Sequence, residues 1–199
     1  MERASSITYK IAVLSSGHSR GSNLSAMHEY WKTHNLPVQI ALAVFTRADS
    51  PAFILAKNLG IPSFVVSAKD MAGFEAEVSK LCIENNISLI ALAGFLKQLS
   101  ASFISSIAIP ILNIHPALLP QYGGKGMYGM AVHKAVWEAG ERESGATIHL
   151  VDPLYDHGKI VASQKVAIDT CQSPEDIATK VLKVEHQLYA KSIYGYLTK

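Results

Sequence analysis

Apolar runs suited to strands alternate with helical patterns through the first half of the chain, and turn residues separate them. The predicted strands are Lys10 to Leu14, Val38 to Phe45 and Ile61 to Val66, and the helices between them run from about Ser22 to His34 and from Ser50-Pro51, an N-cap with a first-turn proline, to Gly60. This alternation predicts a βα-wound sheet.

A nearly all-apolar run, Ile87 to Leu92, predicts the centre of that sheet, because strands buried on both faces lack polar alternation. Before it, Phe74, Val78, Leu81 and Cys82 recur at the spacing of one helix face. The sequence therefore predicts a helix followed by a central strand.

The second half favours a more antiparallel arrangement. The predicted elements are a short helix from Ser100 to Ile107, a strand from Ile109 to Asn113, a helix ending near Gly140, and strands Ala146 to Val151 and Ile160 to Ala167. Ser173-Pro174-Glu175-Asp176 has the N-cap, first-turn proline and acidic third position of a helix start, and Ile177, Val181, Val184 and Leu188 form the apolar stripe of the last helix.

Composition limits the classes of function. The 199 residues are 49% hydrophobic and 17% charged with a formal net charge of +2, which fits a folded core and gives no support to nucleic-acid binding. The apolar run Ile11 to Leu14 is too short for a signal peptide or a membrane span, so a cytoplasmic protein is expected. Cys82 and Cys171 lack Cys-x-x-Cys spacing, which argues against a disulfide scaffold or a zinc knuckle.

The loop after the first strand is a candidate anion site. In doubly wound sheets ligands lie beyond the carboxyl ends of the strands, and the segment Ser16-Gly17-His18-Ser19-Arg20-Gly21-Ser22-Asn23 leads into a helix whose N-terminus favours a phosphate. Neither Gly-x-Gly-x-x-Gly nor the P-loop pattern occurs, which argues against a dinucleotide or NTP site. The alternative is a flexible connector capped by Ser22 or Asn23.

Asn113-Ile114-His115-Pro116, at the exit of a predicted buried strand, is the candidate reaction centre. Asn113 and His115 lie two residues apart and so project to the same side of an extended chain. An amide N–H can stabilise an oxyanion and an imidazole can move protons near neutral pH, which are the two requirements of acyl transfer. The alternative is a pair of side chains that satisfy turn backbone groups.

Two carboxylates, Asp152 and Asp156, follow the strand that carries His149. Either would orient His115, and a carboxylate hydrogen-bonded to that ring is expected to raise its pKa; the alternative is an Asx turn. Gly-x-Ser-x-Gly is absent, so direct attack by an amine fits better than an acyl-enzyme, and the eight histidines show no zinc-site spacing.

Six motifs in this order resemble the glycinamide ribonucleotide formyltransferases of purine biosynthesis, over about residues 9 to 194. They are Gly21-Ser22-Asn23, Leu92-Ala93-Gly94-Phe95, Asn113-Ile114-His115-Pro116-Ala117-Leu118-Leu119-Pro120, Gly145-Ala146-Thr147-Ile148-His149, Asp156-His157-Gly158 and Val184-Glu185-His186.

The resemblance implies an α/β protein with a Rossmann-like formyltransferase fold, in which helices cover both faces of a mostly parallel sheet and the C-terminal part is more antiparallel. It implies one domain over residues 1–199, with a phosphate-binding half at about 9–107 and a folate and catalytic half at about 108–199. The expected co-substrate is 10-formyltetrahydrofolate, with no metal, nucleic acid or membrane partner, and the expected state is a monomer or homodimer.

The resemblance also assigns roles by position. Asn113 would stabilise the oxyanion, His115 would carry protons, and Asp156, rather than Asp152, would hold and polarise His115. The residues expected at the ribonucleotide are Arg20, Gly21, Ser22, Asn23, Pro116 and Glu185, the last at the ribose hydroxyls. Those expected at the folate are Leu92, Leu96, Lys97, Gln98, Leu99, Asn113, Val151 and Asp152.

Some positions depart from the family pattern. The loop between Gly17 and Gly21 is two residues longer than Gly-x-Gly-Ser-Asn, so Arg20 is an extra cation expected to contact the phosphate. Leu182 and Met71 stand where some members carry polar or cationic contacts. The glycine-rich loop from 123 to 129, which includes Lys125, is either a lid or a plain surface loop.

Other functions compete with this interpretation. Formyl transfer to initiator tRNA would bring a further C-terminal domain, and formyltetrahydrofolate hydrolysis would bring an N-terminal regulatory domain; neither is expected from the segments that flank the motifs here. Formylation of a sugar amine is disfavoured by the phosphate loop. A scaffold without turnover is disfavoured because Asn113, His115 and Asp156 are all present.

Overall fold

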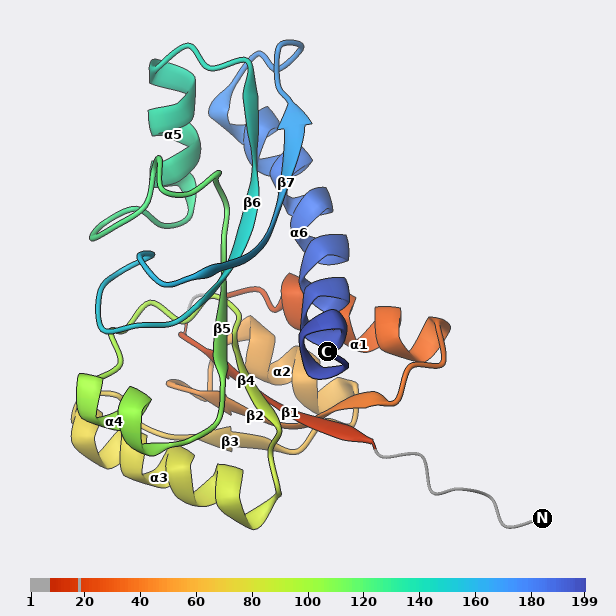
Figure 1. Ribbon diagram of the computed structural model, residues 1–199, viewed down its shortest axis with the longest axis vertical. Helices are drawn as coiled ribbons and strands as arrows, with labels where there is room; N and C mark the ends of the chain where they lie inside the picture. Colours follow the sequence, from red (N-terminus) through yellow and green to blue (C-terminus); the bar gives the residue numbers. More distant parts are fainter. Residues whose placement is uncertain (1–7, 18) are drawn as a thin grey trace.

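In the described part of the computed structural model, residues 8–17 and 19–199, seven strands form one sheet in the order β3-β2-β1-β4-β5-β6-β7 (Figure 1). The strands are β1 (Tyr9–Ser15), β2 (Val38–Phe45), β3 (Ser63–Val65), β4 (Leu89–Leu92), β5 (Ile111–His115), β6 (Glu143–Leu150) and β7 (Ile160–Ala167). The helices are α1 (Ser22–Thr33), α2 (Pro51–Asn58), α3 (Met71–Glu84), α4 (Ala101–Ser106), α5 (Met130–Glu138) and α6 (Pro174–Leu197).

Helices cover both faces of this sheet. Along β1, Ile11 and Val13 pack in a core with residues of α1, α2, α5 and α6, whereas Ala12 and Leu14 pack in a second core with residues of α3 and α4. Because successive strand side chains point to opposite faces, both sets must be apolar. The predicted fold, with helices on both faces and a mostly parallel sheet, is confirmed.

The winding of the sheet fixes where a ligand can bind. Strands β1 to β5 pair in parallel, while β6 and β7 are antiparallel to their neighbours. From β1 the chain winds first towards β2 and β3 and then to the other side, towards β4 and β5. The carboxyl ends of β1 and β4 are therefore a topological switch point, where open α/β sheets bind ligands.

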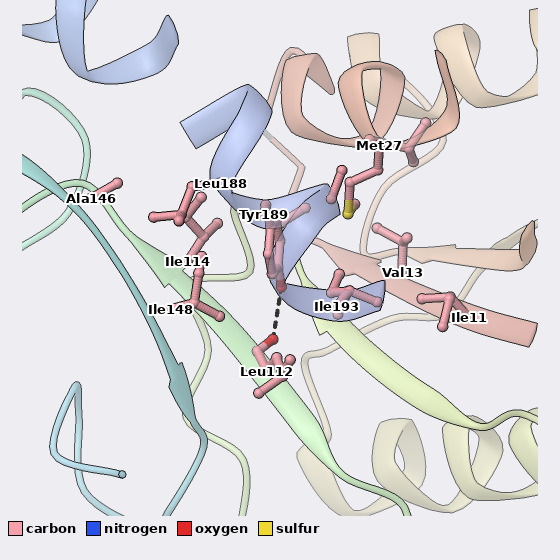
Figure 2. Packing of buried hydrophobic residues seen from close by; sticks show 14 of the residues in the cluster. Ile11, Val13, Met27, Leu112, Ile114, Ala146, Ile148, Leu188, Tyr189 and Ile193 are labelled. Carbon is pink, nitrogen blue, oxygen red and sulfur yellow. Dashed lines mark hydrogen bonds between the residues drawn. The ribbon is translucent and has the colours of Figure 1, made fainter. Parts of the chain in front are cut away.

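The last helix, α6, packs behind this edge. Ser173 caps it by accepting from the N–H of Asp176, as the sequence predicted, and the Pro174 ring occupies the first turn. The buried hydroxyl of Tyr189 lies 2.8 Å from the carbonyl oxygen of Leu112 (Figure 2). It also lies 3.0 Å from the carbonyl oxygen of Leu92. This hydroxyl joins α6 to the ends of β4 and β5, directly beside Asn113.

Several local predictions need correction. Strand β5 runs on to His115 and not only to Asn113, so Asn113 and His115 are both strand residues and Pro116 is the first residue after the strand. Strand β3 is shorter than the predicted Ile61 to Val66. Ser50 stands at the N-cap of α2, but its buried hydroxyl makes no capping bond.

Two further findings concern the cysteines and membrane crossing. Cys82 and Cys171 are both free thiols, and burial raises the pKa of the Cys82 thiol to about 12, which makes it unreactive. In the described residues we find no helix with the length and apolar character that a membrane crossing requires.

Candidate active site

A cavity of about 520 Å³ opens at the carboxyl ends of β4 and β5. Most of the residues expected at a ligand line it: Asn23, Leu92, Leu96, Lys97, Gln98, Leu99, Asn113, His115, Pro116, Val151, Asp152, Asp156 and Glu185. Arg20, Gly21 and Ser22 are not among the described lining residues. The tertiary structure thus brings the residues predicted at the folate and the catalytic candidates together in one cavity. Of the residues expected at the ribonucleotide, Asn23, Pro116 and Glu185 line the same cavity.

Strand pairing places the catalytic candidates. Asn113 of β5 pairs directly with His149 of β6, and His115 pairs with Thr147. Because residues two apart share one face of a strand, Asn113 and His115 both face the cavity, as predicted. Asp156 reaches the same point from the turn that follows β6.

A sharp turn carries Asp156 into this position. Asp156 has a φ of 54°, in the left-handed region that Asp tolerates better than most residues. Gly158 follows because the chain there passes against β6: a Cβ on Gly158 would lie 1.8 Å from the carbonyl oxygen of Leu150. The Asp-His-Gly motif is therefore required by the backbone geometry of the turn, and it also supplies the carboxylate of the site.

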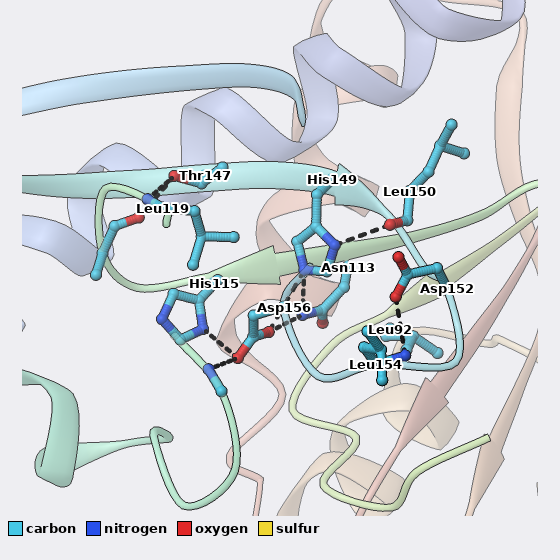
Figure 3. A network of polar contacts seen from close by, with 12 residues as sticks. Leu92, Asn113, His115, Leu119, Thr147, His149, Leu150, Asp152, Leu154 and Asp156 are labelled. Carbon is cyan, nitrogen blue, oxygen red and sulfur yellow. Dashed lines mark hydrogen bonds and ion pairs between the residues drawn. The ribbon is translucent and has the colours of Figure 1, made fainter. Parts of the chain in front are cut away.

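The side chains of Asn113, His115 and His149 form one polar network with Asp156 at its centre (Figure 3). Its Oδ2 lies 3.5 Å from Nδ1 of His115 and accepts the N–H of Gly124 at 3.0 Å. Its Oδ1 lies 3.5 Å from both Nε2 of His149 and Nδ2 of Asn113. The two histidines and the amide therefore surround a single carboxylate.

The charge of Asp156 raises the pKa of His115, as predicted for a neighbouring carboxylate, but the net shift is in the opposite direction. Burial lowers the pKa of this ring, which is 3% exposed, and the charge of Asp156 offsets only part of that effect. For Asp156, burial raises the pKa, but the contacts with His149, His115 and the Gly124 N–H together lower it. The site thus combines an ionised carboxylate with an imidazole that is neutral at pH 7.

Both ring nitrogens of His115 face protein groups. Nε2 lies 2.8 Å from the carbonyl oxygen of Tyr122, which can only accept, so Nε2 carries a hydrogen. In the neutral ring Nδ1 then has the lone pair, and it faces Asp156. Uptake of a proton at Nδ1 would turn this contact into an ion pair.

The second carboxylate of the turn has a different use. Oδ1 of Asp152 accepts the N–H of Leu154 at 2.9 Å, an Asx turn, and its Oδ2 lies 2.8 Å from Nδ1 of His157. Asp152 therefore closes an Asx turn, whereas Asp156 is the carboxylate that contacts His115.

The phosphate end is built from the loop after β1, in which His18 lies outside the described residues. Gly21 is the N-cap of α1 with a φ of 80°, and no side chain caps the helix, so the alternative of a cap by Ser22 or Asn23 is wrong. Instead, Nδ2 of Asn23 donates to Oε2 of Glu185 at 2.7 Å. Burial raises the pKa of Glu185, and the Asn23 contact offsets part of the increase.

Arg20 and Leu182, two of the positions that depart from the family pattern, are both exposed. Arg20 projects from the loop ahead of α1, and Leu182 lies on α6 with 36% of its surface exposed, outside the cavity lining. The loop from 123 to 129 contributes Lys125 and Tyr128 to the cavity wall. It therefore borders the site, and whether it moves stays a prediction.

Two buried histidines of the cavity wall, His149 and His133, were given no role from the sequence, although His149 ends one of the six family motifs. The position of His149 could have been inferred, since it shares one face of β6 with Thr147. His133, in α5, has no such signal; burial, with a smaller contribution from His115, lowers its pKa to about 4. Among residues 8–17 and 19–199, we find no group of His, Cys, Asp and Glu arranged to hold a metal ion.

Comparison with known proteins identifies the family of this chain. A family model described as formyl transferase matches residues 9–193. The chain belongs to the formyl transferase family. The family resemblance predicted from the sequence is confirmed.

Individual members of the family are similar over most of the chain. A Haemophilus influenzae protein named phosphoribosylglycinamide formyltransferase is 34% identical over 90% of this chain and 83% of its own length. The Geobacillus kaustophilus glycinamide ribonucleotide transformylase 1 crystal structure has a TM-score of 0.85 at 32% identity, covering 96% of this chain and 99% of that chain.

Other relatives are longer than this chain. The chloroplastic phosphoribosylglycinamide formyltransferase of Arabidopsis thaliana is 37% identical over 92% of this chain, which spans 64% of that relative. This chain spans 59% of the corresponding protein of Vigna unguiculata and 14% of a trifunctional purine biosynthetic protein of Drosophila melanogaster. Within the formyl transferase family, this domain therefore occurs in chains of different length.

Proposed function

We propose that this formyl transferase family member transfers the formyl group of 10-formyltetrahydrofolate to the amine of 5'-phosphoribosylglycinamide, in purine biosynthesis. The observation that carries the proposal is the convergence of Asn113, His115 and Asp156 in one cavity with Asn23 and Glu185. The names of the relatives support the acceptor and the transfer of a formyl group. We further propose that the enzyme is cytoplasmic, that it is a monomer or homodimer, and that it uses no metal.

The proposed reaction is direct attack by the amine. The amine nitrogen bonds to the formyl carbon, the bond from that carbon to N10 of the folate breaks, and the amine proton ends on N10. An N–H of Asn113 stabilises the oxyanion of the tetrahedral intermediate. No acyl-enzyme is needed, since the amine is itself the nucleophile.

The proton transfers are assigned to His115. Because burial lowers its pKa, the ring is neutral at pH 7 and able to accept a proton. The basic atom is Nδ1, because Nε2–H is donated to Tyr122. The proton stays on Nδ1 of His115, stabilised by the charge of Asp156 3.5 Å away, until N10 takes it.

The two ends of the cavity are assigned to the two substrates. Leu92, Leu96, Leu99 and Val151 provide an apolar wall for the pterin, next to Lys97, Gln98 and Asp152. The N-terminus of α1, with Gly21 and Ser22, takes the phosphate. Asn23, Pro116 and Glu185 take the rest of the ribonucleotide, and Arg20 adds a cation at the phosphate.

The experiment that tests this function incubates the purified protein with 10-formyltetrahydrofolate and follows deformylation of the folate. Three reactions are compared, in which the acceptor is phosphoribosylglycinamide, a sugar amine nucleotide, or water alone. We expect turnover only with phosphoribosylglycinamide, and a kcat lowered by roughly 10² to 10³ in Asn113→Ala. Turnover that does not depend on an acceptor would contradict the transferase assignment, and preference for the sugar amine would change the acceptor.

A further inference from the structure

His149 lies beside the reaction centre, on β6 opposite Asn113, and is 2% exposed. Each of its ring nitrogens has a close partner. Nδ1 lies 2.9 Å from the carbonyl oxygen of Leu150, and Nε2 lies 3.0 Å from Nδ2 of Asn113. These two contacts together determine which end of the Asn113 amide is held.

The carbonyl of Leu150 sets the tautomer of His149. A carbonyl oxygen only accepts hydrogen bonds, so Nδ1 of His149 carries the proton. The neutral ring then has its lone pair on Nε2. Because an amide nitrogen donates and does not accept, the contact at 3.0 Å is a hydrogen bond from Asn113 to His149.

The two hydrogens on the Asn113 amide nitrogen are held unequally. One is bound at 3.0 Å by Nε2 of His149, whereas the contact with Oδ1 of Asp156 is 3.5 Å. A contact of that length holds a hydrogen only weakly. The second hydrogen is therefore available to an oxyanion that develops beside Asn113.

We propose that His149 is a positioning residue, which keeps the donor end of the Asn113 amide turned towards the reaction centre. The proposal rests on the role of Asn113 in the proposed function. Without an acceptor at Nε2, the amide can rotate and present its oxygen to the oxyanion, which repels it. His149 itself touches neither substrate in this scheme.

Two substitutions separate this role from a structural one, because Gln and Asn each reproduce a different nitrogen of the ring. Gln places its amide near Nε2 and can still accept from Asn113, whereas Asn places its amide near Nδ1 and can only preserve the bond to Leu150. We expect His149→Asn to lower kcat by roughly 10- to 100-fold, less than the full loss of an oxyanion donor. We expect His149→Gln to stay within roughly threefold of the original protein, with KM for both substrates little changed in each variant.

The opposite order, with Asn more active than Gln, would show that the bond to Leu150 is what matters and would overturn the proposal. A double-mutant cycle gives the second criterion. In an Asn113→Ala background, His149→Asn should lower kcat by less than about twofold, because the amide it orients is gone. A full additional loss there also overturns the proposal. If Asn113→Ala itself keeps its kcat, it is the proposed function of Asn113 that fails.

A measurement on the unsubstituted protein avoids any dependence on how the variants fold. Nitrogen-15 NMR of the histidine rings distinguishes a protonated ring nitrogen from one with a lone pair. For His149 we expect the proton on Nδ1 and the lone pair on Nε2 at neutral pH. A proton on Nε2 would reverse the direction of the contact with Asn113 and overturn the proposal.

Discussion

The catalytic end and the phosphate end of the cavity are built on different principles. At the catalytic end, Asn113, His115 and Asp156 lie on or beside paired strands, and each contacts another polar side chain of the network. At the proposed phosphate end, the N–H groups of Gly17, Ser19 and Gly21 are bonded within the protein. The feature left to attract an anion there is the first turn of α1, which no side chain caps, with Arg20 exposed before it.

The difference fits what each end is proposed to do. Proton transfer and oxyanion stabilisation need side chains held in one geometry and shielded from water, which the β5–β6 pairing provides. A phosphate carries its own charge and several acceptor oxygens, so a helix N-terminus and a nearby cation suffice. Substitutions at the catalytic end should therefore change kcat, while those at the phosphate end should change KM.

The largest effect is expected for Asp156→Asn, which keeps the shape of the side chain and removes its charge. We expect kcat to fall by roughly 10² to 10⁴ with KM largely kept, because the protonated His115 loses its counter-ion. Since Asp156 raises the pKa of His115, the acid limb of the activity profile should also move to lower pH. Steady-state kinetics from pH 5 to 9 would measure both effects.

The matched control is Glu143→Gln, an exposed carboxylate paired with Lys165 at 3.0 Å, which should leave kcat and KM unchanged. A mild loss in Asp156→Asn, comparable to this control, would mean that Asp156 is not the functional partner of His115.

A smaller effect, on stability, is expected for Gly21→Ala. The backbone there has a φ of 80°, and a Cβ would lie 3.0 Å from both Cα and Cβ of Ala52. We expect a loss of about 1–3 kcal/mol in the free energy of unfolding, measured by urea denaturation.

Gly195→Ala provides the opposite control. Gly195 lies in α6, where an added Cβ meets nothing within 4 Å, so this change should stabilise the protein by about 0.5–1 kcal/mol. Equal effects of the two substitutions would mean that the conformation of the phosphate loop does not require Gly21.

The smallest effect is expected for Arg20→Ala, where we predict a roughly three- to tenfold increase in KM for the ribonucleotide at unchanged kcat. The effect should shrink as salt is added, because the side chain is exposed. Lys32→Ala removes the same charge at the other end of α1 and should leave KM unchanged. If both variants behave alike, Arg20 does not contact the phosphate.

Local sequence patterns were sufficient to predict the elements that depend only on residues nearby in the chain. The apolar run of β4, the stripe of α6 and the Ser173 cap are found as predicted, because burial period and capping are properties of short segments. The end of β5 was misplaced because its last residues extend by pairing with β6, 32 or more positions later in the chain. No short-range pattern contains that pairing.

The sequence by itself determined that this chain is an α/β protein with the motifs of the formyl transferase family, and it marked Asn113, His115 and Asp156 as candidates. Only the tertiary structure decided how they meet: that Asp156 faces His115 while Asp152 closes a turn, and that His149 holds the Asn113 amide. It also decided the direction of the pKa shift of His115, because burial depends on every segment packed around the ring and one neighbouring carboxylate does not outweigh it.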